Sequence, residues 1–325
     1  MPLIKNSTYT TPPFYLINGH LETIIPSVWR TIEGVQYERE RLELADGDFL
    51  DLDWARSGHN RLVILTHGLE GNADRHYIKG MVKLFQANGW DALAWNCRSC
   101  SGEMNRNRRM YHHGDIEDID SVIQQVLSNT NYPTIGLVGF SMGGNITLKY
   151  LGEHGSKLDA SIKGGVAISA PCDLTTSAEL LDHPTRYFYK QKFFRKLAKK
   201  MEFKAQQFPG VIDMDDIKKV KKWKDFDEYF SAPINGFASA QAFYDQASSI
   251  HFLEGIQLPT LLVNAWNDPI LSDECYPTHI AQNHPYLFLE TPNRGGHVSF
   301  VLSKQIHSWV EHRSLAFLES VINKQ

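Results

Sequence analysis

The segment Gly139-Phe140-Ser141-Met142-Gly143 places a serine between two glycines, in the pattern G-x-S-x-G. An apolar run precedes it and a Gly-Gly-Asn-Ile stretch, typical of a helix start, follows it. A sharp turn from strand to helix holds such a serine in a strained conformation with its hydroxyl accessible, and it demands small flanking residues. The pattern alone is weak, so its context carries the prediction that Ser141 is a nucleophile. The alternative is a glycine-rich packing turn.

A serine hydroxyl needs a general base at neutral pH, and the base needs an acid that orients it. In the chain order serine, acid, histidine, the acid belongs after a later strand, and Asp268 follows the predicted strand 260–264. His297 follows the predicted strand 287–290 in a glycine-containing loop that can return over the sheet. We expect Asp268 and His297 to complete a triad. Asp173 is an alternative acid, although it could instead cap a helix.

The negative charge that develops on an ester oxygen needs two preorganised N–H donors. The Met142 amide, next to the serine at a predicted helix N-terminus, is one expected donor. The loop His67-Gly68-Leu69-Glu70-Gly71 follows another buried strand, and the Leu69 amide is the expected second donor of this oxyanion hole. His67 itself is expected to be a structural histidine.

Short apolar runs alternate with amphipathic stretches after residue 37, which predicts an α/β sheet that positions these residues. An antiparallel hairpin at the sheet edge is expected at 38–44 and 49–55. Parallel order is expected for the other strands because crossover connections are right-handed. These strands are predicted at 62–66, 92–95, 134–140, 164–168, 260–264 and 287–290. A final helix is predicted to contain Ile306, Trp309, Val310, Phe317 and Val321.

The alternation of strand and helix patterns is interrupted between residues 173 and 238, where no strand pattern is found and Lys-rich helical stretches occur. We predict an α/β core formed by residues 37–172 and 239–325. A helical cap insertion is predicted at 173–238, and residues 1–36 are expected to form an N-terminal extension that packs on the core. A length of 325 residues suits one large α/β domain with an insertion.

Composition argues against several classes of protein. The net charge of −4 gives no field that would gather nucleic acid. No apolar run reaches the roughly 18 residues of a membrane span, and we expect a cytoplasmic protein. Cys97 and Cys100 lack the second Cys-x-x-Cys pair that a zinc site would need, so packing roles are expected and neither a metal nor an organic cofactor is predicted.

Residues 186–224 hold 13 of the 33 Lys and Arg residues but only 4 acidic residues. Apolar side chains recur every four residues within this stretch, at Tyr189, Phe193, Leu197 and Met201. A basic amphipathic helix of this kind could lie on an anionic membrane. The favoured alternative is a cap helix that packs its apolar stripe on the core and exposes its lysines.

Motifs that occur in order along nearly the whole chain resemble the YheT-like branch of the α/β-hydrolase superfamily. They are Asn18-Gly19-His20-Leu21-Glu22-Thr23-Ile24, His67-Gly68-Leu69-Glu70-Gly71, Arg98-Ser99-Cys100-Ser101-Gly102, Gly139-Phe140-Ser141-Met142-Gly143-Gly144-Asn145, Ser231-Ala232-Pro233-Ile234-Asn235-Gly236-Phe237 and Gly295-Gly296-His297-Val298. The resemblance implies an α/β-hydrolase fold, with a mostly parallel central sheet, helices on both faces and a helical cap. It also implies Ser141, Asp268 and His297 as nucleophile, acid and base.

Four positions depart from the pattern of that branch. Asn267 stands where Asp is usual and Glu22 stands where Gln is usual, while Ser99 and Ser299 replace glycines. Asn267 leaves Asp268 as the acid of this motif. The changes at Glu22 and Ser99 are expected to alter the region through which substrate reaches the site.

The sequence therefore predicts a serine hydrolase that cleaves carboxylic esters through an acyl-serine intermediate. The resemblance implies the substrate class, because members of the family act on acylglycerols, phospholipids or medium-chain esters. Short- or medium-chain acyl esters and acylglycerol-type lipids are therefore the expected substrates. Acyl transfer to an alcohol by the same triad is an alternative, because the acceptor depends on what the cap admits. A catalytically silent fold that serves as a ligand-binding module is a further alternative.

Overall fold

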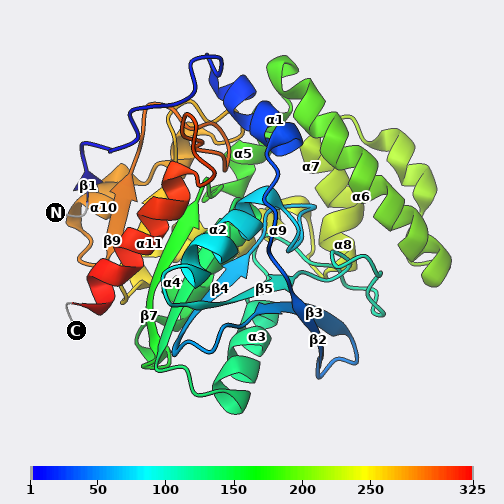
Figure 1. Cartoon of the computed structure of the whole chain (residues 1–325). Coiled ribbons are helices and arrows are strands. Elements are labelled where there is room, and N and C mark those ends of the chain that lie inside the picture. The colour runs from blue at the N-terminus through cyan, green and yellow to red at the C-terminus, as the bar shows by residue number, and fades with distance from the viewer. Residues whose placement is uncertain (1–2, 324–325) are drawn as a thin grey trace.

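The structure is a computed structural model that describes residues 3–323 (Figure 1). Over this range the strands form one sheet in the order β1-β9-β8-β7-β6-β4-β5-β3-β2. Neighbouring strands are antiparallel only in the pairs β2–β3 and β3–β5, so the predicted hairpin edge and parallel centre are confirmed. The strands are β1 (Leu3–Ile4), β2 (Glu38–Glu43), β3 (Phe49–Ala55), β4 (Arg61–Thr66), β5 (Asp91–Asn96), β6 (Thr134–Phe140), β7 (Ile162–Ile168), β8 (Thr260–Val263) and β9 (Leu287–Glu290).

Alternate residues of the central strands enter two hydrophobic clusters on opposite faces of the sheet. In β4, Leu62 and Ile64 belong to one cluster, whereas Val63 and Leu65 belong to the other. Both faces are therefore covered by helices, as a parallel sheet requires. The first face packs against α3 (Ile116–Asn129) and α4 (Met142–His154), and the second against α2 (His76–Gln86) and α11 (Trp309–Ile322).

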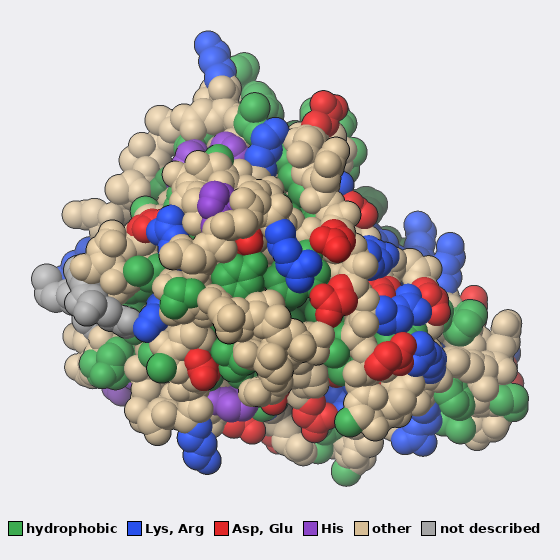
Figure 2. Space-filling model, turned by 60° about the horizontal axis from the view of Figure 1, so that its bottom comes forward, with side chains coloured by type: hydrophobic (Ala, Val, Ile, Leu, Met, Phe, Trp, Pro, Cys, Tyr) green, Lys and Arg blue, Asp and Glu red, His purple; other side chains and the backbone are tan. Residues whose placement is uncertain are grey.

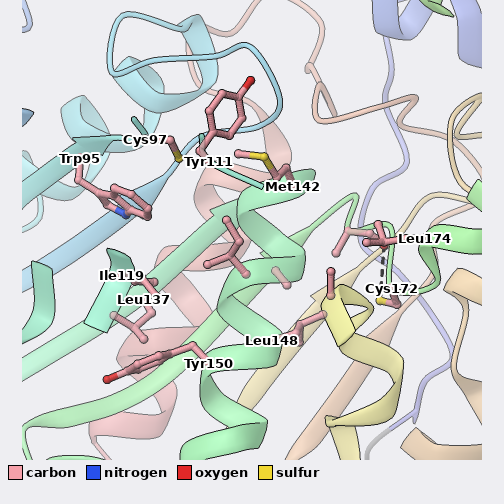
Figure 3. Packing of buried hydrophobic residues seen from close by; sticks show 14 of the residues in the cluster. Trp95, Cys97, Tyr111, Ile119, Leu137, Met142, Leu148, Tyr150, Cys172 and Leu174 are labelled. Atoms are coloured by element: carbon pink, nitrogen blue, oxygen red, sulfur yellow. Dashed lines mark hydrogen bonds between the residues drawn. The ribbon is translucent and has the colours of Figure 1, made fainter. Parts of the chain in front are cut away.

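Figure 3 shows the packing between α4 and the first face of the sheet. In Figure 3, Tyr150 of α4 lies on the side of Leu137 of β6 and Ile119 of α3, whereas Leu148 lies on the opposite side of α4; all four are essentially excluded from solvent. Burial of one such side chain stabilises the fold by roughly 1.5–3 kcal/mol. This packing fixes the direction of α4, and hence the turn that precedes it.

The final helix begins later than its apolar pattern predicts. Ser308 caps α11 by accepting a hydrogen bond from the Glu311 amide, and the Glu311 side chain returns to the Ser308 amide. This capping box starts the helix at Trp309. Ile306 therefore lies outside the helix and is 62% exposed, so its assignment to the helical stripe is wrong.

Two N-terminal elements escaped the sequence analysis. β1 pairs in parallel with β9, and α1 (Gly19–Trp29) begins after Asn18, whose side chain accepts a hydrogen bond from the Leu21 amide. A proline inside α1 and its short length hide its helical pattern. α1 lies beside the start of α6, since His20 Nδ1 and the Tyr189 hydroxyl are 3.1 Å apart.

Only helical elements occur between β7 and β8. They include α5 (Leu174–Leu181), α6 (Tyr187–Gln207), α7 (Trp223–Phe226), α8 (Ala232–Ile234) and α9 (Ala240–Ala247), with a π-helical stretch at Asp227–Ser231; α10 (Thr278–Asn283) follows β8. Tyr189, Leu197 and Met201 of α6 are buried in the core cluster. The packing interpretation of this basic helix is thus confirmed for these three residues, because side chains buried in the core cannot lie on a membrane.

Candidate active site

Ser141 occupies the sharp turn between β6 and α4, with a positive φ of 52°. A Cβ atom at position 139 would come within 2.1 Å of the Gly143 carbonyl oxygen, and one at position 143 within 2.3 Å of the Thr66 carbonyl oxygen. Glycine is required at both positions because backbone occupies the space of a side chain. The predicted strained turn is confirmed, and its second glycine faces the end of β4.

The structure brings together the three residues expected to form a triad, although 156 positions separate Ser141 from His297. His297 Nε2 lies 2.8 Å from Ser141 Oγ, and His297 Nδ1 lies 2.8 Å from Asp268 Oδ2. A carboxylate can only accept, so Nδ1–H donates to Asp268 and Nε2 is free to accept the serine proton. Asp173, the alternative acid, caps α5 by accepting a hydrogen bond from the Thr176 amide.

The loop after β4 offers one uncommitted backbone donor near the serine. The Gly68 amide donates to the Tyr77 hydroxyl, and the Glu70 amide donates to the Tyr111 hydroxyl. The Leu69 amide has no acceptor among residues 3–323. Leu69 and Ser141 line the same cavity, and the Met142 amide lies at the N-terminus of α4, where helical N–H groups lack intrahelical partners.

His67 is fully buried and serves the loop rather than the cavity. Its Nε2 accepts a hydrogen bond from the Cys97 amide, so Nδ1 carries the proton and donates to the Gly68 carbonyl oxygen. Burial lowers the pKa of His67 to about 4, which keeps the ring neutral. The structural role predicted for His67 is confirmed. Cys97 and Cys100 are free thiols within the hydrophobic core, as expected of packing residues.

Residues of α1 hold the loop that carries His297, a role that the sequence analysis missed. The buried Glu22 carboxylate accepts hydrogen bonds from Arg294 Nε at 2.8 Å and from the Gly295 amide at 2.9 Å. Thr23 Oγ1 accepts a hydrogen bond from the His297 amide itself at 2.9 Å. The expectation that Glu22 alters the region of substrate access is wrong, because Glu22 is 1% exposed and lies behind this loop.

Two of the departures from the family pattern lie against each other. Asn267 Nδ2 donates to Glu22 Oε2 at 2.6 Å, and Asn267 Oδ1 accepts from the Gly296 amide at 3.1 Å. The resemblance places glutamine at position 22 and aspartate at position 267. The amide and the carboxylate have therefore exchanged places, while one donor and one acceptor still face each other across the pair.

The other two departures are local. Ser99 keeps the positive φ of 62° expected of a glycine position, and its hydroxyl donates to Asn105 Oδ1 at 2.5 Å. Ser299 is buried and donates to the His297 carbonyl oxygen at 3.2 Å. Neither side chain lines the cavities at Ser141.

Two cavities meet at Ser141 and share Leu69, Phe193, Ile270 and His297. The outer cavity, between α1 and α6, has a volume of about 360 Å³ and a mostly apolar wall that includes Ile24, Val28, Phe188 and Val298. The inner cavity lies under α5 and α7, has a volume of about 50 Å³ and is lined in part by Leu174, Ala178, Leu181 and Asp227. The arrangement can hold a molecule with unequal arms on the two sides of the serine hydroxyl.

In the described range, no group of three or more His, Cys, Asp or Glu side chains is arranged to hold a metal ion. Over residues 3–323, no helix combines the length and apolar character that crossing a membrane demands.

Comparisons with known proteins agree with this architecture. The chain is 31% identical to the putative esterase YheT of Escherichia coli (strain K12) over 304 residues, covering 91% of this chain and 88% of that protein. It is 27% identical to phospholipase ABHD3 of Mus musculus (92% and 74% covered) and 24% identical to a monoacylglycerol lipase of Saccharomyces cerevisiae (94% and 79% covered).

Among solved structures, an esterase of Pyrococcus furiosus, PF2001, superimposes with a TM-score of 0.59 at 18% identity, covering 90% of this chain and 96% of that chain. That likeness concerns the fold. Residues 61–303 match the family described as "alpha/beta hydrolase fold". Because this match spans well over half of the sequence, the chain belongs to the α/β-hydrolase family and, by its likeness to YheT, to the YheT-like branch.

Proposed function

We propose that the chain is a serine hydrolase that cleaves carboxylic esters through an acyl-serine intermediate. The observation that carries the proposal is the hydrogen-bonded series from Asp268 through His297 to Ser141, whose hydroxyl opens into an apolar cavity. The relatives named above as esterase, phospholipase and lipase support an ester as the substrate.

In this mechanism Ser141 Oγ attacks the ester carbonyl carbon while His297 Nε2 takes the hydroxyl proton. Asp268 holds the ring through Nδ1 and stabilises the imidazolium. The Leu69 and Met142 amides donate to the oxyanion, and the loss of one such donor costs about 3 kcal/mol of transition-state stabilisation. His297 then gives the proton to the leaving alcohol, and a water molecule, activated by the same histidine, releases the acid.

The unequal cavities favour an ester with one small arm and one long apolar arm. Short- or medium-chain acyl esters and acylglycerol-type lipids fit this description. We propose that residues 173–238 act as the cap over these arms. Because an alcohol in the outer cavity could replace water in the second step, acyl transfer by the same residues is the second candidate activity.

Labelling with a fluorophosphonate probe tests the proposal. Wild-type protein is expected to be labelled at Ser141 and to hydrolyse p-nitrophenyl esters, whereas Ser141→Ala is expected to do neither. Ser27→Ala removes another hydroxyl from the wall of the outer cavity and is expected to retain labelling. A folded wild-type protein that resists the probe and cleaves none of the esters would instead support the silent binding module.

We further propose peripheral contact with anionic lipid at the mouth of the outer cavity. Val28 and Phe188 line this cavity and are 67% and 79% exposed, and Trp29 next to them is 74% exposed. The basic residues of α6 supply the complementary charge. Vesicles with anionic lipid are expected to float the protein at low salt, and Trp29→Ser together with Phe188→Ser is expected to reduce flotation. Equal flotation by neutral vesicles, or none at low salt, would reject the contact.

A further inference from the structure

The turn that carries Leu69 has an unusual residue at its third position. Residues 68–71 form a turn that is closed by a hydrogen bond of 2.9 Å from the Gly71 amide to the Gly68 carbonyl oxygen. Glu70 is the third residue of this turn and has a positive φ of 55°. A turn with a positive φ at this position usually has glycine there, because a side chain strains the backbone. Contacts from outside the turn must therefore hold Glu70, and with it Leu69, in this conformation.

Such contacts hold both the backbone and the side chain of Glu70. Glu70 Oε1 accepts a hydrogen bond from the Tyr111 hydroxyl at 2.5 Å, and the Glu70 amide donates to the same hydroxyl at 3.2 Å. Lys200 Nζ lies 2.7 Å from Glu70 Oε1. The Glu70 carbonyl oxygen accepts hydrogen bonds from Arg75 at 2.7 Å and from Lys196 at 3.3 Å. These four side chains, here named the Glu70 clamp, engage the amide, the carbonyl and the carboxylate of residue 70.

Two members of the Glu70 clamp come from α6, the helix that lies over the reactive cavity. Lys196 and Lys200 are one helical turn apart on α6, so they reach toward the loop from the same side of the helix. Leu197 and Met201, which follow them in the sequence, are buried in the core cluster. The packing of α6 on the core therefore carries the two ammonium groups to Glu70.

Water is largely excluded from the ion pair of this clamp. On the face shown in Figure 2, Lys and Arg side chains lie next to Asp and Glu at the surface, where solvent weakens their attraction. The side chains of Glu70 and Lys200, by contrast, are only 6% and 14% exposed. Burial opposes the charge of Lys200, but the neighbouring Cys100 and Glu70 raise the pKa of this lysine above its usual value. Removal of one charge would thus leave the other buried without its partner.

We propose that α6 sets the oxyanion hole through Glu70. While Lys196 and Lys200 hold Glu70, the turn keeps its strained conformation and the Leu69 amide keeps its place beside Ser141. When they are lost, the turn relaxes and this donor moves, whereas the apolar cavity that binds the ester remains. Glu70, Lys196 and Lys200 are positioning residues, because none of them lines the two cavities at Ser141. The inference rests on the proposed function, in which the Leu69 amide stabilises the oxyanion.

Kinetics with p-nitrophenyl butyrate provide the first test. Lys200→Met is expected to lower kcat about thirtyfold and to change KM by less than about twofold, because the oxyanion contact is made only in the transition state. Lys200→Arg keeps the positive charge and is expected to stay within about threefold of wild type. Lys199→Met, at an exposed position of the same helix, is the matched control and is expected to keep the wild-type kcat. A rise in KM at unchanged kcat in Lys200→Met would overturn the proposal.

Glu70→Gln tests the same contact from the side of the turn, and it replaces Lys200→Met if that variant does not fold. The glutamine keeps an acceptor for the Tyr111 hydroxyl but removes the charge that pairs with Lys200. We expect kcat to fall about tenfold with KM within about twofold of wild type. A wild-type kcat in Glu70→Gln would contradict the role of the ion pair.

Inhibition by a matched pair of ketones separates an effect on the oxyanion from an effect on the cavity. With 1,1,1-trifluorooctan-2-one, Ser141 Oγ forms a bond to the carbonyl carbon, its proton passes to His297, and the carbonyl oxygen becomes an oxyanion. Octan-2-one occupies the same cavity without appreciable addition. Lys200→Met is expected to weaken inhibition by the trifluoro ketone about thirtyfold and inhibition by octan-2-one less than about twofold. Equal weakening of both would show that Lys200 only shapes the cavity, and would overturn the proposal.

Hydrogen exchange separates this inference from the proposed function, because exchange does not require turnover. Peptides that contain residues 67–71 are expected to exchange at least about fivefold faster in Lys200→Met than in wild type, and no faster in Lys199→Met. Unchanged exchange at this turn would overturn the inference, whether or not the protein hydrolyses esters. Failure of wild-type protein to cleave p-nitrophenyl butyrate would overturn the proposed function alone, since exchange still decides whether α6 holds the turn.

Discussion

The two sides of the reactive cavity are built in different ways. Its floor consists of the turn at residues 139–143 and the loop at 67–71, where backbone packs directly against backbone through glycines. Its roof consists of α1 and α6: Glu22 of α1 is hydrogen-bonded to the loop that carries His297, and Lys200 of α6 forms an ion pair with Glu70 of the floor. The difference indicates that the floor fixes the chemistry, whereas the roof positions the histidine loop and selects the substrate.

Exposed apolar side chains occur on the roof, although Tyr189, Leu197 and Met201 on the inner side of α6 are buried. Met142 and Gly68 of the floor are buried, whereas Val28 and Phe188 of the roof expose most of their apolar surface. Segments with few buried apolar contacts open at lower free-energy cost than the core does. We therefore expect substitutions in the floor to abolish activity, whereas substitutions in the roof should lower kcat/KM only partly.

The largest effect is expected from Gly143→Ala in the floor. The new Cβ would lie 2.3 Å from the Thr66 carbonyl oxygen, so the turn and the end of β4 cannot both keep their positions. We expect a loss of at least about 3 kcal/mol of stability and more than a hundredfold loss of kcat/KM on p-nitrophenyl butyrate. Gly47→Ala is the control, since its Cβ meets no atom within 4 Å and only the positive φ of 80° is strained.

That control is expected to cost about 1 kcal/mol and to retain turnover. Thermal unfolding and ester hydrolysis measure the two quantities. If Gly143→Ala were as active as Gly47→Ala, the backbone contact would not fix the floor.

A reciprocal exchange tests the roof. Asn267→Asp alone sets two carboxylates against each other at the 2.6 Å contact with Glu22, and we expect kcat/KM to fall about tenfold as the His297 loop moves. Glu22→Gln alone weakens the acceptor for Arg294 and Gly295 and is expected to cost about fivefold. The double variant restores one amide and one carboxylate, and its kcat/KM is expected to return to within about threefold of wild type.

Kinetic measurements on the four proteins form a double-mutant cycle. Losses that simply multiply in the double variant would show that the two side chains do not act as a pair.

The smallest effect is expected on stability, at Asp227 beside the inner cavity. Burial raises the pKa of this carboxyl to about 6, whereas an aspartate in an unfolded chain titrates near pH 4, roughly. Because the folded-state pKa is the higher one, the stabilising contribution is complete below the unfolded pKa and is lost as the pH rises through about 6.

Asp227→Asn removes this loss but weakens the hydrogen bond that Asp227 accepts from the Tyr244 hydroxyl at 2.6 Å. At pH 8 we expect the free energy of unfolding of the variant to exceed that of wild type by about 1 kcal/mol. At pH 4 we expect no such gain over wild type. Urea unfolding at the two pH values measures the difference. Asp245→Asn, at an exposed position of α9, is the matched control, and a gain for Asp227→Asn that is the same at both pH values would contradict the account.

The floor was predictable from the sequence because its signals are local. The strand, the glycines and the serine of residues 134–143 are adjacent in the chain, and Asp268 and His297 each follow a recognisable strand. The roof was not predictable in the same way. Glu22 meets its partners 245 and 272 positions away, so no local pattern reports these contacts.

The contacts of the α6 lysines were likewise not predictable from a local sequence pattern. Their spacing predicts one basic helix, yet Lys204 is buried against the Asn105 carbonyl oxygen, Lys200 pairs with Glu70, and Lys192 lines the cavity. Which of them meets an acceptor depends on loops elsewhere in the chain.

Rapid-quench mass spectrometry with p-nitrophenyl butyrate tests the central claim most directly. We predict that wild-type protein carries a butyryl group on the peptide containing Ser141 during turnover, and that Ser141→Ala carries none and does not turn over. Ester hydrolysis by Ser141→Ala at the wild-type rate, with no acyl group on the wild-type protein, would contradict an acyl-serine mechanism.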